Sequence, residues 1–288
     1  MKKILITGAT GNIAGVTLPH LLSSAADVRA LIRDESKAEE LKALGVEVVI
    51  GDLSQPQTLD AAFDGVDKVL LIIPVAPNAV ELGHNALAAA QRSGTPHVIL
   101  VSSNVPEPVN ETEVGRQSII TEAELENAGI PYTIIRPTFF MQNTMMAGQT
   151  VAAQGMVYLP CSVGRLGMID VRDVGAAAAQ LLLSDEHEGK TYVLTGPASI
   201  SISDVASTLS SVLGKEVTYV NVPFEAAKEA MMAMGLPDWM ADMYNEMFKN
   251  FGQNGADFAT ADVENITGRQ AISYQQFAQD FAGAFSAN

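Results

Sequence analysis

The chain has 288 residues, of which 48% are hydrophobic and 17% charged, and its formal net charge is −16. This length is enough for one large domain, or for one domain with an additional lobe. The negative charge argues against nucleic acid and anionic membranes as partners, because both repel an acidic protein.

Cysteine and histidine usage narrows the class of protein further. The single cysteine, Cys161, excludes an internal disulfide, which suits the reducing cytoplasm. No apolar run approaches the ~20 residues of a membrane span, and the first strand begins too early to leave room for a signal peptide. We therefore expect a cytoplasmic protein. The histidines lack the spacing of metal ligands, so no metal is expected; they are His20, His84, His97 and His187.

The first predicted element is a strand that runs directly into a glycine-rich turn. Residues 4–6 are apolar, Gly8 and Gly11 follow, and a helix-like segment comes next. Gly8 permits a tight turn, Gly11 lets a pyrophosphate approach the backbone, and the N–H groups at the helix start attract negative charge. The spacing Gly8-x-x-Gly11-x-x-Ala14 therefore predicts a dinucleotide-binding loop. The residues expected at the cofactor here are Gly8, Thr10, Gly11, Asn12 and Ile13.

Strand and helix signals then alternate. The apolar runs of the strands are continuous, as expected for strands buried on both faces, and the alternation indicates βαβ units with a parallel sheet. Strands are predicted at 28–32, 46–50, 68–73, 97–101 and 132–136, and helices at 36–44, 55–63, 78–92 and 113–128.

After Pro137 the pattern is less regular. Because no low-complexity linker separates the halves, we expect residues 1–136 to form a NAD(P)-binding domain and 137–288 a substrate lobe packed on it, parts of which rejoin the sheet. The predicted helices are at 170–183, 202–213 and two Met-rich segments within about 224–250, and the strands are at 191–194 and 218–222.

The end of the second strand indicates which dinucleotide is bound. An acidic side chain at this position accepts hydrogen bonds from ribose hydroxyls, whereas an arginine pairs with a 2′-phosphate. Arg33 precedes Asp34 here, which favours NADPH over NADH; the alternative is an exposed arginine without a ligand. Lys37 is either a second positive charge for the cofactor or solvated helix surface.

Two further strand ends are predicted to line the same cofactor. Asp52 and Leu53 follow the third strand, where a carboxylate and a backbone N–H commonly hold the adenine edge. The residues expected on the nicotinamide side are Ile73, Pro74 and Val75.

These motifs resemble the NmrA-like, atypical short-chain dehydrogenase/reductase family. The resemblance rests on TGATG at 7–11, Arg33, Gly-Asp-Leu at 51–53 and TEAELENAGIPYTIIRPTFFMQN at 121–143, with a weaker similarity at 169–174. It implies an α/β fold, namely a Rossmann-type doubly wound parallel sheet with a smaller C-terminal α/β substrate lobe, and an NADP cofactor. It also implies that the segment after the sixth strand lines nicotinamide and substrate. The cofactor residues expected there are Pro137, Thr138 and Phe139.

The chain departs from the usual chemistry of short-chain dehydrogenases. Most of them donate a proton from a tyrosine that is followed four residues later by a lysine, but no tyrosine here has that lysine. The family's two positions fall on Val114 and Ser118. General acid catalysis is worth typically ~10²–10⁴-fold, so we expect a substrate that accepts hydride readily, such as a quinone, a cationic dye, an iminium ion or an activated alkene.

Serines after the fifth strand are the expected hydroxyl donors. Ser102 and Ser103 would lie near the nicotinamide, with Ser103 polarising the substrate; a loop-capping role is the alternative. Ser118 and Arg116 are also candidates for the site.

The substrate side is predicted from apolar residues in the second half. Methionine and aromatic side chains form an adaptable apolar wall, although ordinary core or dimer contact is the alternative. The candidates are Phe140, Asn143, Trp239 and Met243. The sequence thus predicts an NADPH-dependent reductase of small hydrophobic or aromatic molecules, as a monomer or homodimer; a non-catalytic NADP-sensing regulator of the NmrA type is the alternative.

Overall fold

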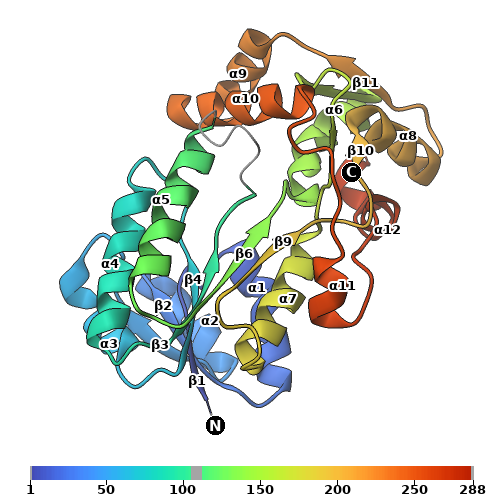
Figure 1. Ribbon diagram of the computed structural model, residues 1–288. Coiled ribbons are helices and arrows are strands. Elements are labelled where there is room, and N and C mark those ends of the chain that lie inside the picture. The colour runs from blue at the N-terminus through green and yellow to red at the C-terminus, as the bar shows by residue number, and fades with distance from the viewer. Residues whose placement is uncertain (1, 105–111, 287–288) are drawn as a thin grey trace. The chain divides into compact units, whose positions relative to one another are not determined.

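The computed structural model describes residues 2–104 and 112–286 and divides into two compact units (Figure 1). Unit 1 consists of Met1–Asn104, Gln117–Pro137 and Val171–Val193, and unit 2 contains the remaining segments. The chain therefore passes between the units several times. Residues 171–193, which follow the boundary predicted at 136, supply a helix and most of a strand to unit 1.

Unit 1 is built on a seven-stranded sheet with the strand order β3-β2-β1-β4-β5-β6-β9. The pairs from β3 through β6 are all parallel. This order, with its reversal between β1 and β4, is that of a Rossmann-type sheet, in which ligands bind at the carboxyl ends of the strands near the reversal. The prediction of a doubly wound parallel sheet is confirmed. The strands are β1 (Lys3–Ile6), β2 (Asp27–Ile32), β3 (Glu47–Ile50), β4 (Lys68–Ile72), β5 (His97–Val101), β6 (Tyr132–Pro137) and β9 (Lys190–Leu194).

Helices cover both faces of this sheet. Figure 1 shows α3, α4 and α5 on one side and α1 and α7 on the other. Ile4 and Leu5 are neighbours in β1 and point to opposite faces, yet both are buried, so the continuous apolar runs reflect burial on two sides. The helices of this part of the chain are α1 (Asn12–Ser23), α2 (Ala38–Ala43), α3 (Asp60–Phe63), α4 (Ala79–Arg92), α5 (Glu113–Asn127) and α7 (Val171–Leu183).

Two predicted helices begin with a 3₁₀ turn. The turn at Glu35–Lys37 precedes α2, and the turn at Pro56–Thr58 precedes α3. In the first turn the Asp34 carboxylate accepts a hydrogen bond from the Ser36 N–H at 2.9 Å. In the second, Pro56 stands at the start, where its missing N–H costs nothing.

Unit 2 contains short elements and two small sheets. In these sheets β7 pairs in parallel with β11, and β8 pairs antiparallel with β10. Several of the elements were not predicted, because segments of two to seven residues are too short to carry a hydrophobic period. The elements of this part of the chain are a 3₁₀ helix at Met141–Ala147, α6 (Gly148–Gln154), β7 (Met156–Leu159), β8 (Arg165–Leu166), β10 (Ile200–Ser201), α8 (Ile202–Leu213), β11 (Thr218–Asn221), α9 (Phe224–Ala233), α10 (Asp238–Gly252), α11 (Asp262–Thr267), α12 (Tyr274–Asp280) and a 3₁₀ helix at Ala282–Phe285.

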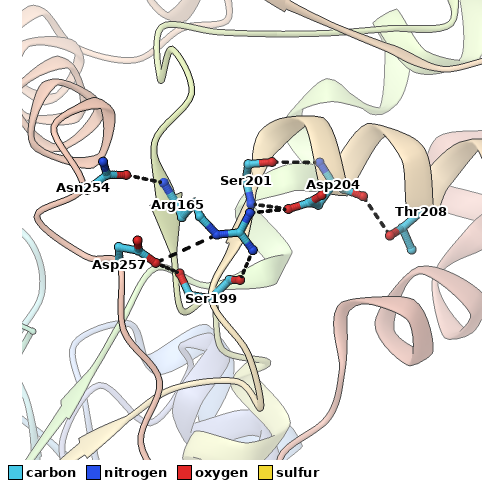
Figure 2. A network of polar contacts seen from close by, with 7 residues as sticks. All are labelled: Arg165, Ser199, Ser201, Asp204, Thr208, Asn254 and Asp257. Atoms are coloured by element: carbon cyan, nitrogen blue, oxygen red, sulfur yellow. Dashed lines mark hydrogen bonds and ion pairs between the residues drawn. The ribbon is translucent and has the colours of Figure 1, made fainter.

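A polar network fixes the two-residue strand β8, as Figure 2 shows. The Arg165 guanidinium donates to the Asp204 carboxylate at 3.1 Å and to the Ser199 carbonyl at 2.6 Å, and it lies 3.9 Å from the Asp257 carboxylate. Asp204 also closes a capping box with Ser201 at the start of α8. One side chain thus ties β8 to the strand and helix that follow it in unit 2.

Candidate functional site

The turn after β1 requires glycine at its first position. Gly8 has φ +59°, and a Cβ there would lie 3.3 Å from Cβ and Cγ2 of Ile72 in β4. The Gly11 N–H donates to the Gly8 carbonyl at 2.9 Å and closes the turn. A side chain at Gly8 would therefore be strained by its backbone conformation and crowded by the neighbouring strand.

Thr7 holds this turn against the end of β4. Its buried hydroxyl donates to the Ile72 carbonyl and accepts from the Ile72 N–H, both at 2.8 Å. These bonds join the carboxyl ends of β1 and β4, between which the strand order reverses.

The start of α1 offers backbone donors to an anion. Gly11 is the N-cap residue and has no side chain to cap the first turn. The first N–H groups of a helix have no partner within it, and the helix dipole makes this end positive. A phosphate therefore fits here without help from a charged side chain.

A cavity of about 560 Å³ lies along this edge of unit 1. Its walls come from the segments that follow β1, β2, β3 and β4, together with the start of α4. Eight of the residues predicted to bind the cofactor line it, namely Gly8, Thr10, Gly11, Arg33, Asp52, Leu53, Pro74 and Val75. Further lining residues, not predicted, are Thr7, Ala9, Leu31, Ile32, Gly51, Ser54, Ile72, Ala76, Asn78 and Leu82. Most of these further lining residues are sequence neighbours of the predicted cofactor residues at strand ends, so their place in the sequence could have indicated them.

Arg33 and Asp34 have different roles despite being adjacent. The Arg33 side chain is exposed at the cavity wall and, in the described part of the chain, forms no hydrogen bond or ion pair. Asp34 caps the 3₁₀ turn that follows, and its hydrogen bond to Ser36 lowers the pKa of its carboxyl group. The cavity therefore has the positive charge of Arg33 at the end of β2, while the carboxylate of Asp34 is engaged in capping the 3₁₀ turn.

The loop after β3 is rigidly held. The Asp52 carboxylate accepts from the N–H and hydroxyl of Ser54 at 2.8 and 2.9 Å. Asn85 of α4 is buried and donates to the Leu53 carbonyl at 2.8 Å. A Cβ on Gly51 would lie 2.9 Å from the Thr58 carbonyl oxygen, so the loop packs too closely for any other residue. This wall of the cavity is thus preorganised.

Six predicted cofactor residues of unit 1 lie outside the cavity lining, namely Asn12, Ile13, Lys37, Ile73, Ser102 and Pro137. Asn12 and Ile13 form the first turn of α1, directly after the lining residue Gly11. Lys37 lies in the 3₁₀ turn and is exposed. Ile73 instead faces α4, since a Cβ on Gly83 would lie 3.0 Å from its Cδ1.

The end of β5 carries a partly buried polar cluster. The hydroxyl of Ser102 donates to the Glu122 carboxylate of α5. Arg136 of β6 binds the same carboxylate through Nε, at 3.0 and 3.2 Å, and through Nη2. This pairing raises the pKa of Arg136 above its ordinary value. Ser102, predicted at the cofactor, thus binds Glu122. Pro137, also predicted there, is the buried last residue of β6 and accepts from the Asn104 N–H at 3.0 Å.

The structure brings two of the predicted catalytic residues together and gives the third another partner. The hydroxyl oxygens of Ser103 and Ser118 lie 2.6 Å apart. Arg116 donates to the Glu113 carboxylate through Nη2 at 2.7 Å and through Nε at 3.1 Å, one turn earlier on α5. No described residues group three or more metal-ligating side chains as a metal site would require.

Thr138 and Phe139 belong to the interior of unit 2. The Thr138 hydroxyl lies within hydrogen-bond distance of the carbonyls of Gly167 and Leu194, which share its single hydrogen. The ring of Phe139 packs edge-on against those of Phe248 and Phe251, with centroids 6.2 and 5.5 Å away, and only 8% of the residue is exposed. Both residues thus have packing roles within unit 2, which sequence spacing alone did not indicate.

The predicted substrate residues differ in exposure. Phe140 and Asn143 are half-buried at the start of the 3₁₀ helix Met141–Ala147. In α10, Trp239 is 37% exposed whereas Met243 is only 7% exposed. Trp239 is therefore available to a ligand of unit 2, while Met243 is mostly enclosed.

Within unit 1 the cavity residues fit a dinucleotide. Two glycines let a ligand approach the backbone, an uncapped helix start offers donors for a pyrophosphate, and Arg33 offers a charge for a 2′-phosphate. The volume also lies in the usual range of about 300–1,000 Å³ for small-molecule sites.

Known proteins resemble this chain over nearly its full length. The NAD(P)H azoreductase of Xenophilus azovorans is 36% identical over 284 residues, which cover 99% of each chain. The structure superposes with a TM-score of 0.90 on an NADPH complex of a quinone oxidoreductase from Escherichia coli, at 26% identity, covering 97% of this chain and 99% of that one. The TM-score is 0.88 for the triphenylmethane reductase of Citrobacter sp. with NADP(H), at 26% identity and with 96% and 99% of the chains covered.

The family assignment rests on the sequence as a whole. The model of the NmrA-like family matches residues 1–276. Because this match extends through both units, this chain belongs to the NmrA-like family.

Proposed function

We propose that this protein is an NADPH-dependent reductase that transfers hydride to electrophilic small molecules. The observation that carries the proposal is the cavity at the reversal of the strand order, where Arg33 is exposed while Asp34 is occupied by the cap of the next turn. The names of the relatives, an azoreductase, a quinone oxidoreductase and a triphenylmethane reductase, support the same class of reaction.

Each part of the cavity is assigned to a part of the cofactor. The glycine turn and the first N–H groups of α1 bind the pyrophosphate, and Arg33 binds the 2′-phosphate. Asp52 and Leu53 border the adenine, and Pro74 and Val75 border the nicotinamide half. The bound cofactor supplies a hydride ion. Phe140 and Trp239, which are accessible within unit 2, stay predictions as substrate contacts.

The absence of a Tyr/Lys pair from the sequence limits the substrates. Reduction of a simple ketone needs a proton donor, whereas a quinone, a cationic dye or an activated alkene accepts hydride and takes any proton it needs from water. Ser103 and Ser118 supply the hydroxyl groups of the site. Arg116, the third candidate for the site, pairs with Glu113 one turn earlier on α5, and we assign it to orienting the start of that helix.

The test is NADPH oxidation in the presence of quinones, azo dyes and triphenylmethane dyes, followed at 340 nm. Turnover with at least one class, and slower turnover with NADH, is expected. Tight NADPH binding without oxidation by any of them would contradict the proposal and favour a cofactor-sensing regulator.

We also propose a cytoplasmic monomer or homodimer that does not bind nucleic acid. The single cysteine and the net charge of −16 support this. No helix in the described ranges is long and apolar enough to cross a membrane. Light scattering after size exclusion would give the oligomeric state.

A further inference from the structure

In the polar cluster at the end of β5, one serine hydroxyl hydrogen is left without an acceptor among the described side chains. A serine hydroxyl has one hydrogen to donate. Ser102 gives its hydrogen to Glu122. Ser103 and Ser118 form a pair at 2.6 Å, in which one hydroxyl donates to the other. The accepting hydroxyl keeps its own hydrogen, because neither serine forms another side-chain hydrogen bond in the described part of the chain.

Glu122 is held in place by strong contacts on two elements. Its side chain is 5% exposed, and Arg136 binds both carboxylate oxygens. Charge-assisted bidentate pairs of this kind restrict the geometry of both partners. Ser118 lies four residues before Glu122 on α5, so the two side chains share one face of the helix. Fixing Glu122 against β6 therefore also fixes the turn of α5 that carries Ser118.

The cluster stands beside the cofactor cavity. Val101, the residue before Ser102, pairs with Ile72 of β4, and Ile72 lines the cavity. Adjacent strands lie about 4.8 Å apart, so the residues after β5 are at the same edge of the sheet as the segment assigned to the nicotinamide.

We propose that Glu122 is a positioning residue. Held by Arg136, it accepts the hydrogen of Ser102 and keeps Ser118 within hydrogen-bond distance of Ser103. The pair of Ser103 and Ser118 then has one hydroxyl hydrogen left to donate to a substrate oxygen. This inference rests on the proposed function and narrows its substrates. When hydride from NADPH adds to a quinone, the electron pair moves onto the carbonyl oxygen; the serine pair donates a hydrogen bond to that anion, which then takes a proton from water. A triphenylmethane cation accepts hydride at carbon and becomes neutral, with no anion to stabilise.

The two substrates therefore provide an internal control. Ser118→Ala removes one hydroxyl of the pair, and Glu122→Gln removes the negative charge that Arg136 binds. We expect each variant to lower kcat for a quinone by about tenfold or more, with less than a twofold change in kcat for a triphenylmethane cation. Glu124→Gln is the matched control on α5, because Glu124 pairs with the exposed His84 instead. It should leave both rates unchanged.

Readouts that do not depend on turnover separate positioning from damage to the fold. NADPH affinity, measured by fluorescence, should stay within twofold of the wild-type value in Ser118→Ala. If Glu122→Gln does not fold, Arg136→Lys replaces it, since lysine keeps the charge and loses the bidentate geometry.

The possible results are distinguishable. A fall in the ratio of quinone to dye turnover supports the positioning role. An equal loss with both substrates, or no loss with either, overturns it. If the wild-type protein oxidises NADPH with neither substrate, the proposed function itself fails.

Discussion

At the scale of single residues, the local backbone gives the adjacent side chains of Arg33 and Asp34 different roles. Arg33 and Asp34 both follow β2, and either one alone would suggest a different dinucleotide. The 3₁₀ turn that begins at Glu35 engages the Asp34 carboxylate as its cap. Arg33 remains exposed at the cavity wall.

The role of Arg33 is testable by charge reversal. Arg33→Asp should weaken NADPH binding by roughly tenfold or more, because a charge-assisted hydrogen bond contributes about 1.5–3 kcal/mol and this side chain is exposed to solvent. NADH binding should change much less, since NADH lacks the 2′-phosphate. Dissociation constants from fluorescence titration would measure both.

Lys42→Asp is the control for this charge reversal. It makes the same change in net charge at an exposed lysine that pairs with Glu39 and does not line the cavity. It should leave both affinities nearly unchanged. An equal loss of NADPH and NADH binding in Arg33→Asp would refute the assigned role.

At the scale of elements, two helices of unit 1 approach each other closely because one carries a glycine. A Cβ on Gly175 of α7 would lie 2.5 Å from Cγ2 of Val16 and 3.1 Å from the backbone nitrogen of Thr17, both in α1. Since α1 starts at the cavity and α7 lies far along the chain, this contact positions the anion-binding end of α1.

Enlarging this contact should destabilise unit 1. We expect Gly175→Ala to cost about 1–3 kcal/mol through overpacking, measured by urea unfolding. Adding Val16→Ala should restore part of the loss, because one of the crowded atoms is the Val16 side chain. Gly15→Ala is the control: nothing lies within 4 Å of its Cβ, so alanine should stabilise α1 by up to about 1 kcal/mol. A stable Gly175→Ala protein would contradict the close contact.

A chain of hydrogen bonds joins β5, β6 and the segment before β9. The Thr133 hydroxyl donates to the His187 carbonyl at 2.7 Å and accepts from His97, whose Nε2 lies 2.9 Å away. Burial, and to a lesser extent the charge of Lys68, lowers the pKa of His97 below its ordinary value of 6.5.

This lowered pKa predicts a pH dependence of stability. Between the folded pKa of His97 and pH 6.5, His97 is protonated in the unfolded chain but neutral in the folded protein. The free energy of unfolding should therefore be highest above pH 6.5 and decrease as the pH drops toward the folded pKa. Urea unfolding between pH 7.5 and 5.5 would measure the slope, and His97→Gln should reduce it. A stability that does not change over this range would contradict the expectation.

At the scale of the whole molecule, charge is the dominant global property. The net charge of −16 gives the folded state more self-repulsion than a neutral protein has. Sodium chloride at 0.5 M, an added salt that shortens the Debye length to about 4 Å, should raise Tm by roughly 2–5 °C. A lower Tm in salt would mean that the surface ion pairs contribute more than the repulsion costs.

The sequence by itself predicted much of unit 1. The strands, the glycine turn and Arg33 were recognisable because each depends on a short window: a run of apolar residues, a spacing of glycines or a residue at a strand end. The predicted strand at 97–101 has the same bounds as β5. Unit 2 was less predictable, because elements such as β8 and β10 have two residues each and depend on distant contacts, such as that between Arg165 of β8 and Asp204.

Only the tertiary structure decided which side chains act together. Ser102, Glu122 and Arg136 come from a strand end, a helix and another strand, and no sequence spacing relates them. The same holds for Phe139, whose ring packs with aromatic residues more than 100 positions later. Local backbone preference acts over a few residues and is written in the sequence, whereas a contact between distant side chains exists only after the sheet and its helices have packed.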